Sequence, residues 1–82
     1  MDEKKIEVLF FSILREQAAC SETTVNTKAN TALELYGELT SLYSLNVPPE
    51  TLLVAVNEEY MGMDGTIKDG DCVVFLPPVA GG

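Results

Sequence analysis

The 82 residues of this chain are enough for one small domain but not for a second hydrophobic core. Thirteen acidic residues against five basic ones give a net charge of −8, which argues against nucleic-acid binding. The absence of histidine, together with two cysteines that lack metal-ligand spacing, excludes zinc sites, Cys–His dyads and Ser–His–Asp triads. No apolar run approaches the roughly 20 residues that span a membrane, and residues 1–11 lack a signal-peptide core, so we expect a cytoplasmic protein that makes no membrane contact.

The first third of the chain predicts a hairpin whose two strands are connected by a short helical turn. Residues Lys5–Phe11 alternate as a strand, with Ile6, Val8 and Phe10 on one face. The other face carries Leu9 and Phe11, so it is apolar where a solvent-facing side would be polar. Ser12 is a candidate helix cap for a short helical turn over residues 13–19, and the Thr-rich residues 21–27 predict the returning strand.

The main helix is predicted over residues 32–43. Thr31 followed by Glu34 is a capping-box pattern, which marks the first turn of a helix. Apolar residues then recur at helical spacing, and we expect all of them to pack in the core: Ala32, Leu35, Leu39 and Leu42, with Tyr36 and Tyr43 beside them. Residues 46–49, which include two prolines, end the helix and form a loop.

The second half of the chain predicts three strands. Residues 52–56 are apolar throughout, which is typical of a strand buried on both faces. After a turn at residues 57–59, residues 60–61 form a short edge strand, and residues 62–68 are rich in turn formers. A turn at residues 69–71 leads into the last strand, residues 72–76, which Pro77 and Pro78 end because proline has no N–H for the ladder.

This order of elements predicts an α+β fold, with a mixed sheet of about five strands and one main helix packed across one of its faces. A hairpin followed by a helical crossover brings the first and last strands together as parallel neighbours, which is the ubiquitin-like β-grasp. We place the domain at residues 1–77 and a flexible tail at residues 78–82. Cys20 and Cys72 are far apart in sequence, and we expect both to be half-buried or buried thiols.

The tail ends in Gly81-Gly82, which has two interpretations. A frayed terminus of no functional meaning is one. The other is that the small, uncharged residues after Pro77-Pro78 form an extended arm that can enter a narrow channel in another protein. The Gly82 carboxylate would then be the reacting group. Once activated as an acyl-adenylate it can accept sulfur to become a thiocarboxylate, or be attacked by an amine to give an isopeptide bond.

The chain resembles the small, sulfur-carrying subunit of molybdopterin synthase over nearly its whole length. The double proline before the end is the most specific element of the resemblance. The residues that carry it are Val8–Phe11 with Arg15-Glu16, then Leu53–Asn57, Asp69–Asp71 and Phe75–Gly82.

The resemblance implies a sulfurtransferase subunit with no catalytic site, metal or bound cofactor of its own. An E1-like enzyme that uses ATP would adenylate Gly82, a sulfur donor would convert it to a thiocarboxylate, and Gly81 would keep the approach open. The sulfur would pass to cyclic pyranopterin monophosphate in molybdenum cofactor biosynthesis, within a heterotetramer of two small and two large subunits.

The resemblance also implies a partner surface. Phe11, Tyr60 and Leu76 match apolar positions that the family uses to bind its partners, and Arg15 matches a position nearby. The tail residues complete the predicted interface: Pro77, Pro78, Val79 and Ala80. Two alternatives remain open, namely that the apolar residues pack under the helical turn at residues 13–19, and that Arg15 is a solvated surface charge.

Two other functions fit a β-grasp domain with this ending. One is a ubiquitin-like modifier that becomes conjugated to lysines. The other is a sulfur carrier for a different product, such as the thiazole of thiamine or cysteine.

Overall fold

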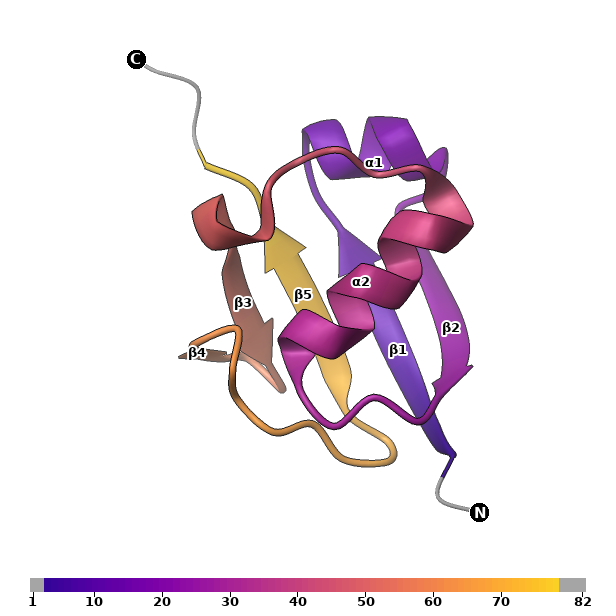
Figure 1. Ribbon diagram of the computed structural model, residues 1–82, viewed down its shortest axis with the longest axis vertical. Coiled ribbons are helices and arrows are strands. Elements are labelled where there is room, and N and C mark those ends of the chain that lie inside the picture. Colours follow the sequence, from indigo (N-terminus) through magenta and orange to yellow (C-terminus); the bar gives the residue numbers. More distant parts are fainter. Residues whose placement is uncertain (1–2, 79–82) are drawn as a thin grey trace.

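A computed structural model describes residues 3–78 of the chain. Five strands form one sheet in the order β2-β1-β5-β3-β4, and helix α2 crosses one face of it (Figure 1). The elements in chain order are β1 (Lys4–Phe10), α1 (Ile13–Ala18), β2 (Glu22–Thr27), α2 (Ala32–Tyr43), the 3₁₀ turn η1 (Pro49–Thr51), β3 (Leu53–Val56), β4 (Glu59–Met61) and β5 (Cys72–Leu76).

The sheet is mixed. β1 pairs antiparallel with β2 and parallel with β5, and β5 pairs antiparallel with β3, which in turn pairs antiparallel with β4. The first and last strands are therefore parallel neighbours at the centre of the sheet. This confirms the predicted β-grasp arrangement.

The ends of α2 follow from its local sequence. The Thr31 hydroxyl accepts a hydrogen bond from the Glu34 backbone N–H at 3.2 Å, and the Glu34 carboxylate accepts one from the Asn30 N–H at 2.8 Å. This reciprocal capping satisfies donors that the first turn would otherwise leave unpaired. At the other end Ser44 takes a left-handed conformation, and its N–H donates to the Thr40 carbonyl. The predicted bounds of this helix are confirmed.

The core lies between α2 and the sheet. β1 contributes Ile6, Val8 and Phe10, and β5 contributes Val73 and Phe75, each at most 2% exposed. The helix contributes the buried side chains Ala32, Leu35, Tyr36 and Leu39.

The prediction that Leu42 of α2 packs in the core is wrong. Leu42 is 66% exposed. In the last turn of the helix the inward position belongs to Tyr43, whose ring packs edge-on against Phe10 with centroids 5.6 Å apart. The Tyr43 hydroxyl also donates to the Thr23 hydroxyl of β2 at 3.0 Å, so the last turn is oriented by Tyr43 and Leu42 faces solvent.

Four further details differ from the sequence prediction. Leu53 is 60% exposed, so β3 is not buried on both faces. Phe11 lies just beyond the end of β1, and Ser12 makes no side-chain capping bond to α1. Residues 49–51 form the 3₁₀ turn η1, whose first residue, Pro49, was predicted to be the last residue of a loop.

Candidate functional site

The sheet face opposite α2 carries a contiguous set of apolar side chains. The strand registers arrange this face in rows. The row closest to Pro77 contains Leu53, which is opposite Leu76, and Phe11 follows β1 at the same end. The next row contains Leu9, Val74, Ala55 and Tyr60, each paired with its neighbour across the ladders.

Several of these side chains are well exposed for their size. Tyr60 is 73% exposed, Leu53 60% and Phe11 46%, whereas Leu9, Val74 and Leu76 are half-buried. A contiguous apolar surface of this kind on a small protein marks an interaction site. We call the set Phe11, Leu9, Val74, Leu76, Leu53 and Tyr60 the apolar zone.

The structure brings together three of the residues that the sequence analysis selected. Phe11, Tyr60 and Leu76 all belong to the apolar zone, and the exposure of Phe11 excludes the alternative that it is buried under α1. Arg15 is exposed on α1, outside the sheet. Their roles in binding remain predictions.

Sequence reasoning missed Leu53 and Val74 as members of this face. Leu53 stands next to the buried Val54, and Val74 stands between the buried Val73 and Phe75. Successive side chains of a strand point to opposite faces, so both residues lie on the face opposite their buried neighbours. This alternation cannot be recognised from the sequence where all residues of a strand are apolar.

The connection between β1 and α1 is held in an unusual backbone conformation. Ser12 has φ 55° and ψ −129°, a region that residues other than glycine rarely occupy. On the far side of α1, the Gln17 side chain accepts a hydrogen bond from the Asn46 backbone N–H at 3.0 Å and donates one to the Asn46 side chain. Together these features fix α1, with the exposed Ile13, next to Phe11 of the apolar zone.

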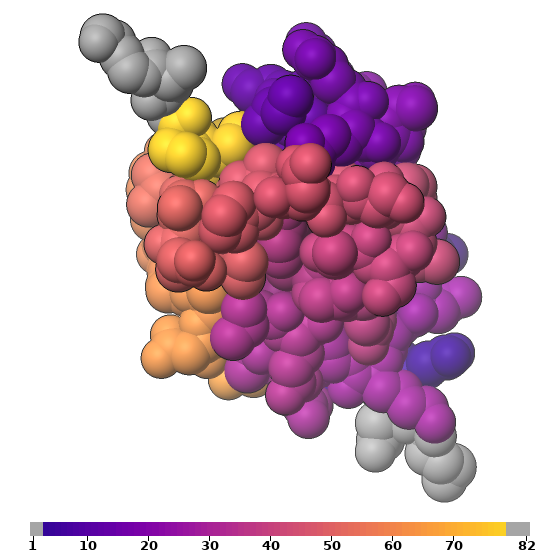
Figure 2. All heavy atoms as spheres, turned by 45° about the horizontal axis from the view of Figure 1, so that its top comes forward, coloured from indigo at the N-terminus to yellow at the C-terminus, as the bar shows by residue number. Residues whose placement is uncertain are grey.

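The carboxyl-terminal segment starts next to this zone. Pro77 is half-buried and Pro78 is exposed. In Figure 2 the last described residues, in yellow, lie at the surface between the salmon segment around η1 and the indigo segment of α1. Val79, Ala80, Gly81 and Gly82 lie outside the described residues, so their predicted roles stay predictions.

A polar row borders the apolar zone at the end of the sheet remote from Pro77. Cys72 lies opposite Glu7 of β1, and its backbone N–H donates to the Asn57 side-chain oxygen at 3.0 Å. Burial raises the pKa of the Cys72 thiol, and the nearby carboxylates of Glu7, Glu58 and Glu22 raise this pKa further. The thiol is therefore a weak nucleophile at neutral pH. Both Cys72 and Cys20 are free and half-buried.

Neither a metal cluster nor a membrane-spanning helix is found in the described part of the chain. Residues 3–78 contain no group of three or more acidic or cysteine side chains arranged to hold a metal ion. None of the helices within residues 3–78 has the length and apolar character needed to cross a membrane. A pocket of about 460 Å³ lies on the α2 side, lined by Leu33, Pro49, Glu50, Leu52 and Met63, and is separate from the apolar zone.

Comparison with known proteins assigns this arrangement to a family. Residues 8–82 match the model of the ThiS family. The chain belongs to this family. The match begins within β1 and runs through the apolar zone and the glycine-ended tail sequence.

The relatives of this ThiS-family chain carry a consistent name. The molybdopterin synthase sulfur carrier subunit of Escherichia coli is 35% identical over 80 residues, which cover 94% of this chain and 99% of the relative. The resemblance stated from the sequence is thus confirmed.

Two solved structures extend the comparison. The complex of subunits 1 and 2 of the molybdopterin-converting factor from Helicobacter pylori contains a chain that matches with a TM-score of 0.63 and 29% identity, covering 95% of this chain and 99% of that one. The small archaeal modifier protein 1 of Methanosarcina acetivorans matches with a TM-score of 0.78 over the full length of both chains. At 21% identity, the second match shows the common fold alone.

Proposed function

We propose that this chain is the sulfur-carrying subunit of a molybdopterin synthase. The observation that carries the proposal is its identity of 35% with the E. coli sulfur carrier subunit over nearly the full length of both chains. The chain also has the Pro77-Pro78 and Gly81-Gly82 pairs that such a carrier needs for a presented carboxylate.

The proposed chemistry takes place on the Gly82 carboxylate. Attack of this carboxylate on ATP, bound by an E1-like activating enzyme, gives an acyl-adenylate and releases pyrophosphate. A sulfur donor then displaces AMP and leaves a thiocarboxylate. Gly81 assists by having no Cβ, so that other groups can approach the terminal carbonyl closely. Apart from this carboxylate, which attacks ATP, the acids, bases and nucleophiles of these steps come from the partner proteins.

The sulfur is then delivered to cyclic pyranopterin monophosphate in the large subunit. Because φ is fixed in Pro77 and Pro78, they hold the start of the tail extended beside the apolar zone. From Pro78 to Gly82 the tail spans at most about 17 Å, at roughly 3.3–3.6 Å per residue. This length suits delivery into a site that opens next to the docked sheet face. Each synthase would contain two small and two large subunits.

The apolar zone is the surface that we assign to the large subunit. A relative of this chain forms a complex with the second subunit of its converting factor, which supports a partner of that type. The same face must serve the activating enzyme at another stage, because the tail starts at its edge and has to reach both active sites.

Mass spectrometry of the intact protein tests the proposal. Incubation with the activating enzyme, ATP and a sulfur donor should increase the mass by the difference between one sulfur and one oxygen. Deletion of Gly82 should abolish this change while the unfolding temperature stays the same, since terminal residues contribute little to stability.

The outcomes separate the candidate functions. No mass change with an activating enzyme that charges a known carrier would contradict the proposal. Isopeptide-linked adducts in a cell extract, without sulfur transfer, would instead indicate a protein modifier. Transfer to a thiazole synthase but not to the large synthase subunit would indicate a carrier for another pathway.

A further inference from the structure

Two carboxylates lie on the same sheet face as the apolar zone, and a third lies in the turn between β3 and β4. Glu7 on β1 is opposite Cys72, and Glu22 on β2 is opposite Leu9. Glu58 lies in the β3–β4 turn, directly after Asn57, whose backbone N–H donates to the Cys72 carbonyl at 2.8 Å. All three are exposed. We call Glu7, Glu22 and Glu58 the acidic zone.

The acidic zone has a net negative charge at one place on the sheet. Its three carboxylates come from different parts of the chain: Glu7 pairs with Cys72, Glu22 pairs with Leu9 two residues further along β1, and Glu58 follows Asn57, which bonds to Cys72. The cation that shares this face of β1 is Lys5, which precedes Glu7 by two residues. Arg15 lies on α1, at the other end of the domain.

We propose that the acidic and apolar zones form one docking surface, whose partner carries an apolar patch bordered by lysine and arginine side chains. This inference rests on the proposed function and specifies the chemistry of the large-subunit surface that receives this chain. The apolar zone is buried against the partner. The acidic zone orients the docked chain so that its tail points to the partner's active site.

The charges distinguish this partner from a second copy of the chain. An exposed apolar face alone would favour self-association. A symmetric pair formed through this face would bring together the six carboxylates of two acidic zones, against two Lys5 side chains on the same face of β1. Like charges brought together at an interface oppose binding. The acidic zone therefore disfavours self-pairing and favours a basic partner.

The two zones should affect different rate constants of binding. Complementary charges around an interface act mainly on the association rate, and buried apolar contacts act mainly on the dissociation rate. Electrostatic steering raises association rates by about 10- to 1,000-fold, and this gain falls as ionic strength rises.

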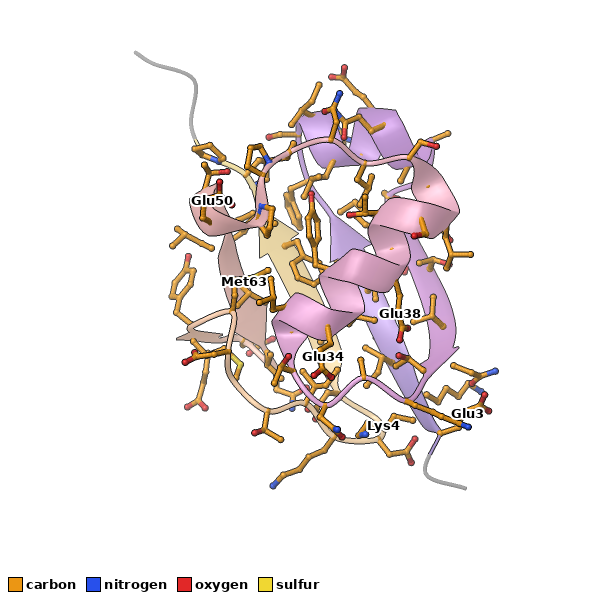
Figure 3. The ribbon with its side chains drawn as sticks, viewed as in Figure 1. Glu3, Lys4, Glu34, Glu38, Glu50 and Met63 are labelled. Carbon is orange, nitrogen blue, oxygen red and sulfur yellow. The ribbon has the colours of Figure 1, made fainter. Side chains whose placement is uncertain are left out.

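Stopped-flow or surface-plasmon measurements with the intact large subunit test the inference. The test variant is Glu7→Gln/Glu22→Gln/Glu58→Gln. The matched control is Glu50→Gln/Glu59→Gln/Asp64→Asn, which removes three exposed negative charges from other places: η1, the α2 side of β4, and the loop after β4. Glu50, the middle residue of η1, is labelled in Figure 3.

At low salt the test variant should associate about tenfold more slowly than the wild type, and the control within about twofold of it. The difference between test and control should shrink as salt is added. Equal association rates and equal salt dependence for the two variants would overturn the inference. If the wild-type chain itself does not bind the large subunit, the proposed function fails instead, so the two failures can be told apart.

Discussion

Leu53 lies opposite Leu76 in the β3–β5 ladder, and both side chains point to the sheet face that α2 leaves uncovered. Leu76 is the last residue of β5, and Pro77 follows it directly. This pair therefore joins the docking face to the start of the tail. A partner that covers Leu53 and Leu76 lies within reach of the tail without any rearrangement of the domain.

Leu53→Gln should weaken binding to the large subunit with little effect on stability. The side chain is 60% exposed in the free protein, and covering it by a partner is worth about 1–2 kcal/mol, which corresponds to an affinity loss of about five- to thirtyfold. Isothermal titration calorimetry measures this loss. Leu42→Gln is the matched control, because Leu42 is equally exposed on α2 and should leave the affinity unchanged. Equal affinity losses for both variants would remove the sheet face from the interface.

Leu39→Ala should be far more destabilising than Leu42→Ala, although both leucines belong to the apolar stripe of α2. Leu39 is fully buried, so its truncation leaves a cavity and costs about 2–5 kcal/mol. Leu42 is 66% exposed, so its truncation should cost less than about 1 kcal/mol. Urea unfolding of the two variants gives both values. A loss of several kcal/mol for Leu42→Ala would mean that the last turn of α2 packs against the core after all.

The Cys72 thiol should react slowly with iodoacetamide at pH 8, and Glu7→Gln should speed the reaction. Burial raises the pKa of this thiol first, and the Glu7 carboxylate next to it adds to the increase by disfavouring a second negative charge. Removing that charge should increase the thiolate fraction severalfold. The rate is measured in a Cys20→Ser background, so that only the reaction of the Cys72 thiol is observed. An unchanged rate in Glu7→Gln would show that the carboxylate does not act on Cys72.

Tyr36→Phe should destabilise the protein by about 1 kcal/mol at neutral pH, because the Tyr36 hydroxyl donates to the Val47 carbonyl at 2.7 Å. Burial raises the pKa of the Tyr36 hydroxyl. The stability that the folded tyrosine contributes is thus complete below its unfolded pKa of about 10 and is lost as pH rises toward its folded pKa.

The difference in unfolding free energy between the wild type and Tyr36→Phe should therefore shrink above about pH 10. Urea unfolding at pH 7 and at alkaline pH measures it. A difference that stays constant with pH would mean that Tyr36 ionises equally easily in the folded and unfolded chains.

The elements of the fold were predictable because local signals define them. Thr31 and Glu34 start α2 by capping it, and the turn at residues 69–71 together with Pro77 sets the limits of β5. The pairing of the first and last strands also followed from the sequence, because a helical crossover after a hairpin leaves a place for the last strand beside the first. The tail chemistry was likewise assigned from Gly81-Gly82 and Pro77-Pro78 alone.

The exposure of individual apolar residues was not predictable in the same way. Leu53 stands in a strand whose neighbours are all apolar, so its sequence context cannot say which face a helix will cover. Leu42 belongs to the helical stripe but lies at its margin, and the contacts of Tyr43 with Phe10 and Thr23 decide the rotation of the last turn. Both outcomes depend on elements far away in the sequence.

What the sequence alone determined is therefore the set of elements and their order, because caps, turns and prolines act over a few residues. What only the tertiary structure decided is which side chains lie together on the proposed docking surface. Leu9, Val74, Leu53 and Tyr60 come from four strands, and Glu7, Glu22 and Glu58 from three places in the chain. Lateral strand register brings them together, and register is fixed by burial of the opposite face under α2.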